Sequence, residues 1–172
     1  YIRRMKLNAS GVRIGSTKNV RPPGVSSGYL FNHPYVLDAS DNNRMYLPIG
    51  SNIWRNSNLN GLDNNQNNWT NLGSVNNTIT ALDASKSDPG VVYFGTNSRK
   101  IYRMEDNGTA NPTITEISSG ITNGGYTSNI TIDPYDANKV IVIYSNYNTI
   151  SGWYTEDGGT NWTNIEGNLK GV

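Results

Sequence analysis

The chain contains no cysteine among its 172 residues, so neither a disulfide nor a thiolate metal site can stabilise it. Its one histidine, His33, excludes a metal site of three histidines and leaves a single imidazole as a candidate base. Charged residues make up only 16%, the net charge is +1, and no basic run is longer than Arg3-Arg4. The chain therefore lacks the clustered positive charge that binds the phosphates of nucleic acid. No apolar run approaches the length of a membrane span, so we expect no membrane insertion.

The polarity of the chain comes from uncharged side chains instead. Asn alone makes up about a sixth of the residues, and there are 18 Gly. The 11 Tyr and 4 Trp are more aromatic residues than a disordered chain would carry. This composition is typical of an all-β protein rich in turns, and the length suffices for one domain with a core. Combined with the absence of cysteine, it favours a secreted or cell-surface protein, which we expect to be bacterial.

The ends of the chain carry no terminal signature. Its first residues, Tyr1 to Leu7, show no signal-peptide pattern, and its last residues, Lys170 to Val172, show no sorting motif. We therefore expect the sequence to be an excerpt from a longer polypeptide.

The stretch from Ser151 to Ile165 has the best-specified turn chemistry in the chain. Residues that favour strands lie on both sides of Asp157-Gly-Gly159, which is a tight-hairpin signal. An Asp at such a turn can accept hydrogen bonds from backbone N–H groups, and a Gly can adopt positive φ without steric cost. Trp162 can cover the turn and donate its indole N–H to a backbone carbonyl.

This stretch resembles the Asp-box, also called the BNR repeat, whose pattern is Ser/Thr-x-Asp-x-Gly-x-Thr-Trp. Thr155, Asp157, Gly159 and Trp162 match the pattern, while Asn161 stands where the family usually has Thr. The weight of the resemblance depends on whether the chain repeats.

The chain does repeat, because three apolar segments each end in an Asp that opens a polar turn. The three Asp residues are 45 and 50 residues apart. The segments are Pro34–Asp38, Ile79–Asp83 and Ile130–Asp133. Each is followed by three further short strands. In the first repeat they are predicted at Arg44–Leu47, Asn52–Arg55 and Asn68–Leu72, and in the second at Val91–Thr96, Lys100–Met104 and Thr113–Ile117. In the third repeat they are predicted at Lys139–Tyr144, Gly152–Tyr154 and Asn161–Ile165.

Four short strands in every 45 to 50 residues are typical of a β-propeller blade. We therefore predict an all-β fold, a β-propeller of about three four-stranded antiparallel blades that form an incomplete ring. Residues 1–30 are predicted to be a linker or a strand from a preceding blade, 31–76 blade 1, 77–124 blade 2, and 125–172 blade 3 with the Asp-box.

The turn between the third and fourth strands is preserved to different degrees in the other two repeats. The second repeat keeps Asp106 and Gly108 but has no Trp. The first repeat keeps Trp69, has Asn58 at the Asp position, and carries a longer Asn-rich loop over residues 56–68. We predict that all of these turns are structural, and that the Asn turn is less rigid because amide groups make weaker hydrogen bonds than an ionised carboxylate.

From about Phe31 to its end, the chain resembles the large propeller proteins with BNR or sortilin-like repeats, which include relatives of xyloglucan-cleaving glycoside hydrolases. Segments such as Val92–Thr96 and Trp162–Leu169 are similar to those that recur from blade to blade in such proteins. The resemblance implies complete rings, whereas three blades would expose two apolar flanks. We therefore expect the remainder of a propeller, or other chain segments, to be a partner of this chain.

Glycoside hydrolysis requires two carboxyl groups on either side of a bond, roughly 5–10 Å apart. The candidates are Asp38, Asp83, Asp133 and Asp157. All four recur at equivalent positions of the repeats, which favours turn capping over catalysis. In the hydrolases that the chain resembles, the acids come from opposite walls of a cleft between two propellers, and three blades could supply one wall. We assign no catalytic residue to this chain.

We also expect no metal and no cofactor. Asp133, Asp136 and Asn138 lack the spacing of a dedicated calcium loop, and so do Asp41, Asn42 and Asn43, so solvated turns are the favoured interpretation. His33 lies between Asn32 and Pro34 at the start of a predicted strand, which favours a structural or surface role.

Aromatic side chains near loops are the remaining functional candidates, because flat rings beside Asn side chains suit sugar binding. They are Tyr126, Tyr135, Tyr147, Trp54 and Trp153. The two Trp residues occupy matched third-strand positions, which indicates packing between blades. Tyr135 and Tyr147 are left as candidates for a glycan or protein surface.

Three functions follow. The leading one is a non-catalytic propeller segment of a secreted or cell-surface protein that acts as a scaffold or binding module for glycan or protein. The second is a fragment of a propeller glycoside hydrolase acting on β-glucan or xyloglucan. The third is a sortilin-like receptor propeller that binds peptide.

Overall fold

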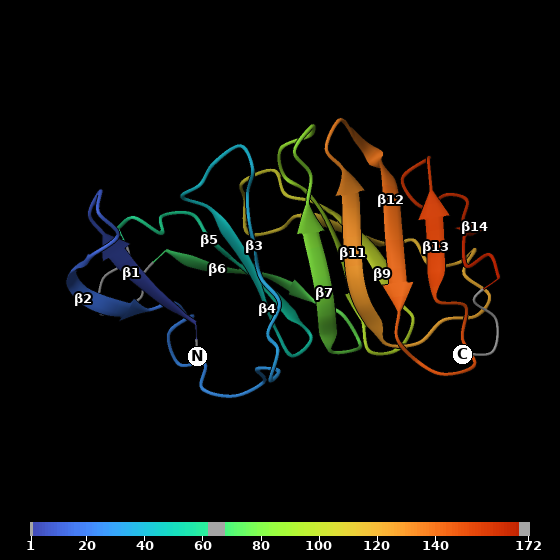
Figure 1. Ribbon diagram of the computed structural model, residues 1–172, viewed down its shortest axis with the longest axis horizontal. Helices are drawn as coiled ribbons and strands as arrows, with labels where there is room; N and C mark the ends of the chain where they lie inside the picture. Colours follow the sequence, from blue (N-terminus) through green and yellow to red (C-terminus); the bar gives the residue numbers. More distant parts are fainter. Residues whose placement is uncertain (1, 62–67, 169–172) are drawn as a thin grey trace.

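The computed structural model describes residues 2–61 and 68–168, and within these ranges it contains β-strands and no helix (Figure 1). Strands β1 (Arg3–Leu7) and β2 (Arg13–Asn19) form a hairpin. The other strands form three four-stranded antiparallel sheets, in each of which the hydrogen-bonded order follows the chain. The predicted all-β fold of four-stranded blades is confirmed.

We call the three sheets blades 1, 2 and 3. Blade 1 contains β3 (Val36–Leu37), β4 (Met45–Ile49), β5 (Asn52–Asn56) and β6 (Trp69–Ser74). Blade 2 contains β7 (Ile79–Ala84), β8 (Val91–Thr96), β9 (Ile101–Glu105) and β10 (Thr113–Glu116). Blade 3 contains β11 (Thr127–Asp133), β12 (Asp136–Tyr144), β13 (Gly152–Thr155) and β14 (Thr163–Asn164).

The strands lie close to where the repeat placed them, with differences at some ends. Strand β8 has the predicted bounds, whereas β11 and β12 each begin three residues earlier than predicted. Strand β14 is shorter than predicted and pairs with β13 only through Thr163 and Asn164. Asn161 does not extend the strand, because its backbone N–H donates to Asp157 within the turn.

Two layers of the core lie on the two faces of blade 2, because successive residues of a strand point to opposite faces of a sheet. Val92 and Phe94 of β8 pack against blade 1, and the Phe94 ring stacks on Tyr102 with centroids 5.3 Å apart. Val91 and Tyr93 of the same strand pack against blade 3. Both faces of blade 2 are therefore buried, as expected of a blade between two neighbours.

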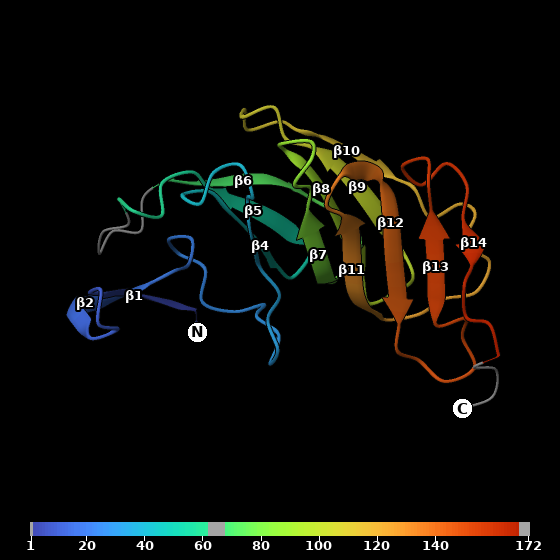
Figure 2. The same cartoon turned by 45° about the horizontal axis from the view of Figure 1, so that its top comes forward.

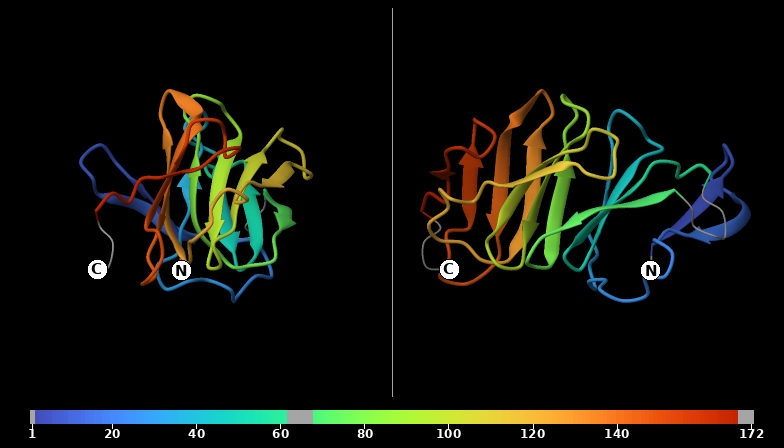
Figure 3. Two further views of the ribbon diagram at one scale, coloured as in Figure 1. Left: turned by 90° about the vertical axis from the view of Figure 1, so that its right-hand side faces the viewer. Right: turned by 180° about the vertical axis from the view of Figure 1, so that it is seen from behind.

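The blades follow one another in an open arc (Figure 2). Strand β7 contacts β3 of blade 1 and β11 of blade 3, so the first strands of successive blades meet along the inside of the arc. Seen from behind in Figure 3, the β1–β2 hairpin lies at one end of the arc and blade 3 at the other. The ring is not closed.

The segment before blade 1 covers the face of that blade that points away from blade 2. Val20 is buried there, and Val25 and Tyr29 pack beside it against a layer that includes Leu47 and Ile49 of β4. The sequence predicted a linker or a strand from a preceding blade in this region. The structure shows the β1–β2 hairpin here, whose turn is closed by the Asn8 side chain accepting hydrogen bonds from two backbone N–H groups.

Candidate functional site

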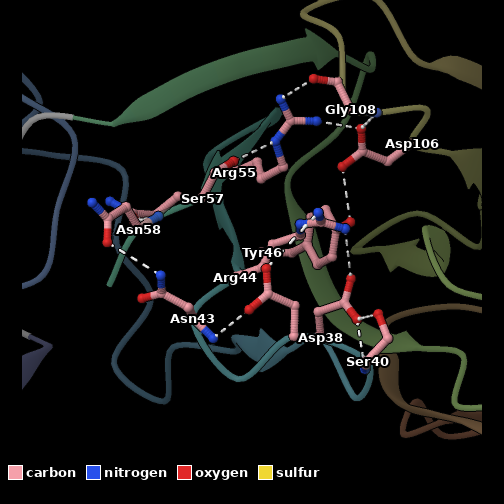
Figure 4. A network of polar contacts seen from close by, with 12 residues as sticks. Asp38, Ser40, Asn43, Arg44, Tyr46, Arg55, Ser57, Asn58, Asp106 and Gly108 are labelled. Carbon is pink, nitrogen blue, oxygen red and sulfur yellow. Dashed lines mark hydrogen bonds and ion pairs between the residues drawn. The ribbon is translucent and has the colours of Figure 1, made fainter. Parts of the chain in front are cut away.

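A buried ion pair joins blade 1 to the turn that follows β9 of blade 2 (Figure 4). The Arg55 guanidinium pairs with the Asp106 carboxylate and also donates from Nη2 to the Gly108 carbonyl at 2.9 Å. Tyr46 Oη donates to Asp106 Oδ2 at 2.8 Å. Asp106 and Gly108, which the sequence assigned to a structural turn without a Trp, thus hold two blades together.

Every charged group of this cluster has hydrogen-bond partners, which offsets the cost of removing it from water. Asp106 Oδ1 accepts the Gly108 N–H at 2.9 Å, and Arg55 Nε donates to Ser57 Oγ at 3.0 Å. Burial and the nearby Asp106 charge raise the pKa of Tyr46, so its hydroxyl stays protonated and remains a donor.

The recurring Asp residues at the ends of first strands have two structural roles. Asp38 accepts the Ser40 N–H at 2.8 Å and pairs with Arg44 at 3.2 Å, so it closes its own turn (Figure 4). Asp133 likewise accepts the Tyr135 N–H at 2.8 Å.

Asp83 instead reaches across to the next blade. Its Oδ1 accepts the Ala84 N–H, and its Oδ2 accepts the Ile132 N–H of blade 3, both at 2.9 Å. Burial raises the pKa of this carboxyl, while the two backbone hydrogen bonds oppose the shift.

The four residues that matched the turn motif in blade 3 lie together. Thr155 Oγ1 donates to Asp157 Oδ1 at 2.9 Å and accepts the Gly159 N–H at 2.9 Å. Asp157 also accepts the Asn161 N–H at 2.8 Å and the Asn161 side-chain amide at 2.7 Å. Asn161, the one departure from the motif, therefore takes part in closing the turn.

The Thr155–Trp162 turn also packs against blade 2. The Trp162 indole N–H donates to the Ile117 carbonyl at 2.8 Å. Gly159 has φ 93°, and a Cβ there would lie 2.5 Å from Ile117 Cδ1. The motif thus serves contact between blades as well as local turn closure.

Replacing Trp162 by Phe is expected to lower the free energy of unfolding by about 1 kcal/mol, because the half-buried Ile117 carbonyl loses its donor while most apolar contact is kept. The measurement is urea unfolding followed by circular dichroism. Trp69→Phe is the matched control, since the Trp69 indole N–H has no hydrogen-bond partner among the described residues. An equal loss in both variants would contradict the role of the Trp162 hydrogen bond.

Two carboxyl groups should titrate in opposite directions from the ordinary aspartate value. The Asn161 hydrogen bonds lower the pKa of Asp157, so its contribution to stability is present above the ordinary pKa and lost as the pH falls through the lowered one. Burial raises the pKa of Asp83, so the protonated form is favoured in the fold and that contribution is lost as the pH rises through the raised pKa. Carbon-13 NMR of the two carboxyl groups over pH 2 to 7 tests this; midpoints in the reverse order would refute it.

The third turn, in blade 1, is only partly described. Asn58 Oδ1 accepts the Gly61 N–H at 2.9 Å and the Asn43 side-chain amide at 3.1 Å, as an Asp at this position would (Figure 4). Trp69 is half-buried and packs with the layer that the N-terminal segment covers. Residues 62–67 of the longer loop lie outside the described residues.

The two Tyr residues predicted as a ligand surface are exposed but far apart. Tyr135 is 90% and Tyr147 is 86% exposed. They lie just beyond opposite ends of β12, and a nine-residue strand separates such positions by roughly 30 Å. The structure therefore does not bring them into one patch. Trp153 is buried and donates its indole N–H to the Asn123 carbonyl at 3.0 Å, and Trp54 packs with the covered face of blade 1.

A polar pocket of about 150 Å³ lies between the segment that leads into β3 and the first strands of blades 2 and 3, β7 and β11. It is lined by Asn32, His33, Pro34, Thr80, Ala81, Leu82, Ser128 and Asn129. Single-sequence patterns could not reveal it, because the residues come from three blades and share no motif.

His33 is the titratable group of this pocket. Its Nδ1 accepts the Leu30 N–H at 3.1 Å, and the Tyr29 ring lies 4.9 Å from the imidazole. Burial lowers the pKa of His33, so the imidazole is neutral at neutral pH. The pocket thus offers uncharged donors and acceptors, which suit a neutral polar ligand better than an ion.

The Asp and Asn groups considered as calcium loops close turns in the structure. Asp41 accepts the Asn43 N–H at 2.9 Å, and Asp136 accepts the Asn138 N–H at 3.0 Å. In residues 2–61 and 68–168, no group of three or more His, Asp or Glu side chains could hold a metal ion. No helix in the same ranges is long and apolar enough to cross a membrane.

The open arc of four-stranded blades, built around a first strand on its inner side, is part of a β-propeller. Solved propeller structures show the same fold. A GH74 enzyme of Niastella koreensis superposes with TM-score 0.61 at 17% identity over 77% of this chain, and the GH74 xyloglucanase of Xanthomonas campestris with TM-score 0.56 at 16% identity over 78%. The chain spans only 22% and 23% of those two proteins. No family model and no curated protein matches the sequence.

Proposed function

We propose that this chain is a non-catalytic segment of a larger β-propeller, which acts in a secreted or cell-surface protein as a scaffold and binding module for glycan or protein. The observation that carries the proposal is how the Asp side chains are used. Asp106 and Asp83 join neighbouring blades, and Asp38 and Asp157 close turns. Carboxylates held in this way serve rigidity, and a rigid frame presents loops and pockets to ligands.

The Thr155–Trp162 turn supports assignment to the Asp-box class within this proposal. Its Asp accepts hydrogen bonds inside the turn, and its Trp packs against the core between blades 2 and 3 and donates to blade 2. This assignment implies no activity, since fold alone does not determine function.

The pocket lined by His33 is the binding surface that we propose for a neutral glycan. Asn32, Thr80, Ser128 and Asn129 supply the amide and hydroxyl groups that sugar hydroxyls pair with. Neutral His33 can take part without charge. The exposed Tyr135 and Tyr147 are two further, separate contact points that aromatic stacking on sugar rings could use.

Calorimetric titration of the 172-residue chain with xyloglucan and β-glucan oligosaccharides tests this proposal. We expect saturable binding that Asn129→Ala weakens and that Asn111→Ala leaves unchanged, because Asn111 is an exposed Asn far from the pocket in the turn before β10. Equal weakening by both variants, or no binding to any oligosaccharide, would refute a glycan site at this pocket.

A fragment of a propeller glycoside hydrolase is the second candidate. The structural similarity to the xyloglucanase of Xanthomonas campestris favours it. The two candidates differ in product formation. If incubation with xyloglucan releases reducing sugar, and Asp133→Asn or Asp157→Asn abolishes the release, the chain is catalytic and the non-catalytic proposal is wrong.

A further inference from the structure

We propose that the outer face of blade 3 is a socket for the third-to-fourth strand turn of one further blade, and that this turn carries a neutral or basic residue where blade 2 carries Asp106. The inference rests on the proposed scaffold function and adds to it the site and chemistry of the next contact. It follows from comparing one register pair in the three blades.

Blade 1 shows an occupied socket. Tyr46 and Arg55 face each other across β4 and β5 on the side that faces blade 2. The turn after β9 lies against them, with the Asp106 carboxylate bound by both side chains. A cationic socket on blade 1 thus holds an acidic turn from blade 2.

Blade 2 shows a second occupied socket at the same register. Tyr93 pairs with Arg103 across β8 and β9, and Arg103 Nε donates to Tyr93 Oη at 3.1 Å. The turn of blade 3 covers this pair, since a Cβ added at Gly158 would lie 3.5 Å from Tyr93 Oη. The same docking occurs in both contacts between successive blades.

In blade 3 the same two register positions are occupied by Ile141 and Tyr154, and no blade packs against them. Ile141 faces Tyr154 across β12 and β13, and Ile141 is 39% exposed. A pocket of about 340 Å³ lies beside them, lined by Tyr154, Thr155, Glu156, Asp157, Asn161 and Thr163. Figure 1 shows this sheet flat-on, with no other strand in front of β12 and β13.

The backbone carbonyl of Ile165 is a second feature of the open face of blade 3. Ile117 and Ile165 are equivalent, because each donates its N–H to the first residue of the third strand of its blade, Ile101 or Gly152. The Ile117 carbonyl accepts the Trp162 indole N–H of the next blade. Among the described residues no donor pairs with the Ile165 carbonyl, and the Ile165 side chain is 44% exposed. A Trp from a further blade fits here.

The charge of the open socket differs from that of blade 1. No Arg stands at the register position of Arg55, which Tyr154 occupies. Tyr154 Oη donates to Glu156 Oε1 at 3.0 Å, and the Asp157 carboxylate also lines the pocket. An incoming Asp would meet two like charges, whereas a neutral or basic residue would not. The charge therefore selects which turn docks.

An extended chain tests the socket. In this variant, a second copy of residues 120–168 is joined directly after Gly167. The junction keeps the spacing that links blade 2 to blade 3. The copied Asp157 is replaced by Asn. We expect the indole N–H of the copied Trp162 to exchange with solvent at least about tenfold more slowly than an exposed indole, measured by NMR. Exchange at the exposed rate would overturn the proposal.

Two variants separate the parts of the inference. Ile141→Glu in the original blade should abolish the protection in the extended chain but leave the unfolding midpoint of the 172-residue chain nearly unchanged, because Ile141 is exposed there. Retaining Asp in the copied turn should reduce the protection; equal protection would refute the charge requirement. Formation of dimers with an unprotected copied indole would assign the face to a second chain instead. None of these outcomes depends on glycan binding by the 172-residue chain.

Discussion

Asp106→Ala is expected to lower the free energy of unfolding by about 3–5 kcal/mol, because it leaves the Arg55 guanidinium buried without its counter-charge. The Arg55 side chain is 6% exposed and that of Asp106 is fully buried, so water cannot replace the lost partner. Tyr46 loses its acceptor at the same time. Urea unfolding followed by tryptophan fluorescence and by circular dichroism measures the loss.

Glu105→Ala is the matched control for this prediction. Glu105 is the neighbouring acid and pairs with Arg103 on the surface, where an ion pair contributes about 0–1 kcal/mol. The double variant Arg55→Met, Asp106→Leu should recover much of the loss, because no uncompensated charge stays buried. If Asp106→Ala unfolds at the same denaturant concentration as Glu105→Ala, the ion pair does not hold blades 1 and 2 together.

Gly159→Ala should cause the second largest loss of unfolding free energy. This loss has two causes, backbone strain at positive φ and overlap with Ile117, and Gly108→Ala at the equivalent place of blade 2 separates them. Both residues have positive φ, 93° and 84°, which costs a residue with a Cβ about 1–2 kcal/mol. Nothing lies within 4 Å of a Cβ at Gly108, whereas one at Gly159 would overlap the Ile117 side chain. Overpacking should add about 1–3 kcal/mol at Gly159 alone.

The difference between the two Gly variants in urea unfolding is the quantity to measure. Ile117→Ala combined with Gly159→Ala should remove the overlap, so the double variant should lose less than the sum of the single variants. Equal losses in Gly159→Ala and Gly108→Ala would mean that the turn of blade 3 does not press on blade 2. Additive losses in the double variant would lead to the same conclusion.

Local pattern was sufficient for the repeat unit of this fold. Short strands such as Val91–Thr96, separated by turns rich in Gly, Asn and Asp, specify their own hairpins because the required hydrogen bonds are between near neighbours. The Thr155–Trp162 turn was predictable for the same reason, since Thr155, Asp157 and Asn161 close it within seven residues. The open ring also followed from counting the repeats.

Contacts between repeats were not predictable from that pattern. Asp106 and Asp157 occupy equivalent sequence positions, yet Asp106 is buried against Arg55 and Asp157 closes an exposed turn. The N-terminal hairpin and its cover over Leu47 were also missed, because nothing in residues 1–30 repeats elsewhere in the chain. The pocket of His33 was missed because its lining comes from three blades.

The sequence by itself determined the sheets, their order and the turns that close them, because these depend on side chains and backbone groups only a few residues apart. Only the tertiary structure decided which Asp joins blades, which polar groups share a pocket and which face of blade 3 is open. Those properties depend on how one blade is placed against the next, and that placement is set by buried contacts between residues roughly 50 positions apart, such as Arg55 with Asp106 and Ile117 with Trp162.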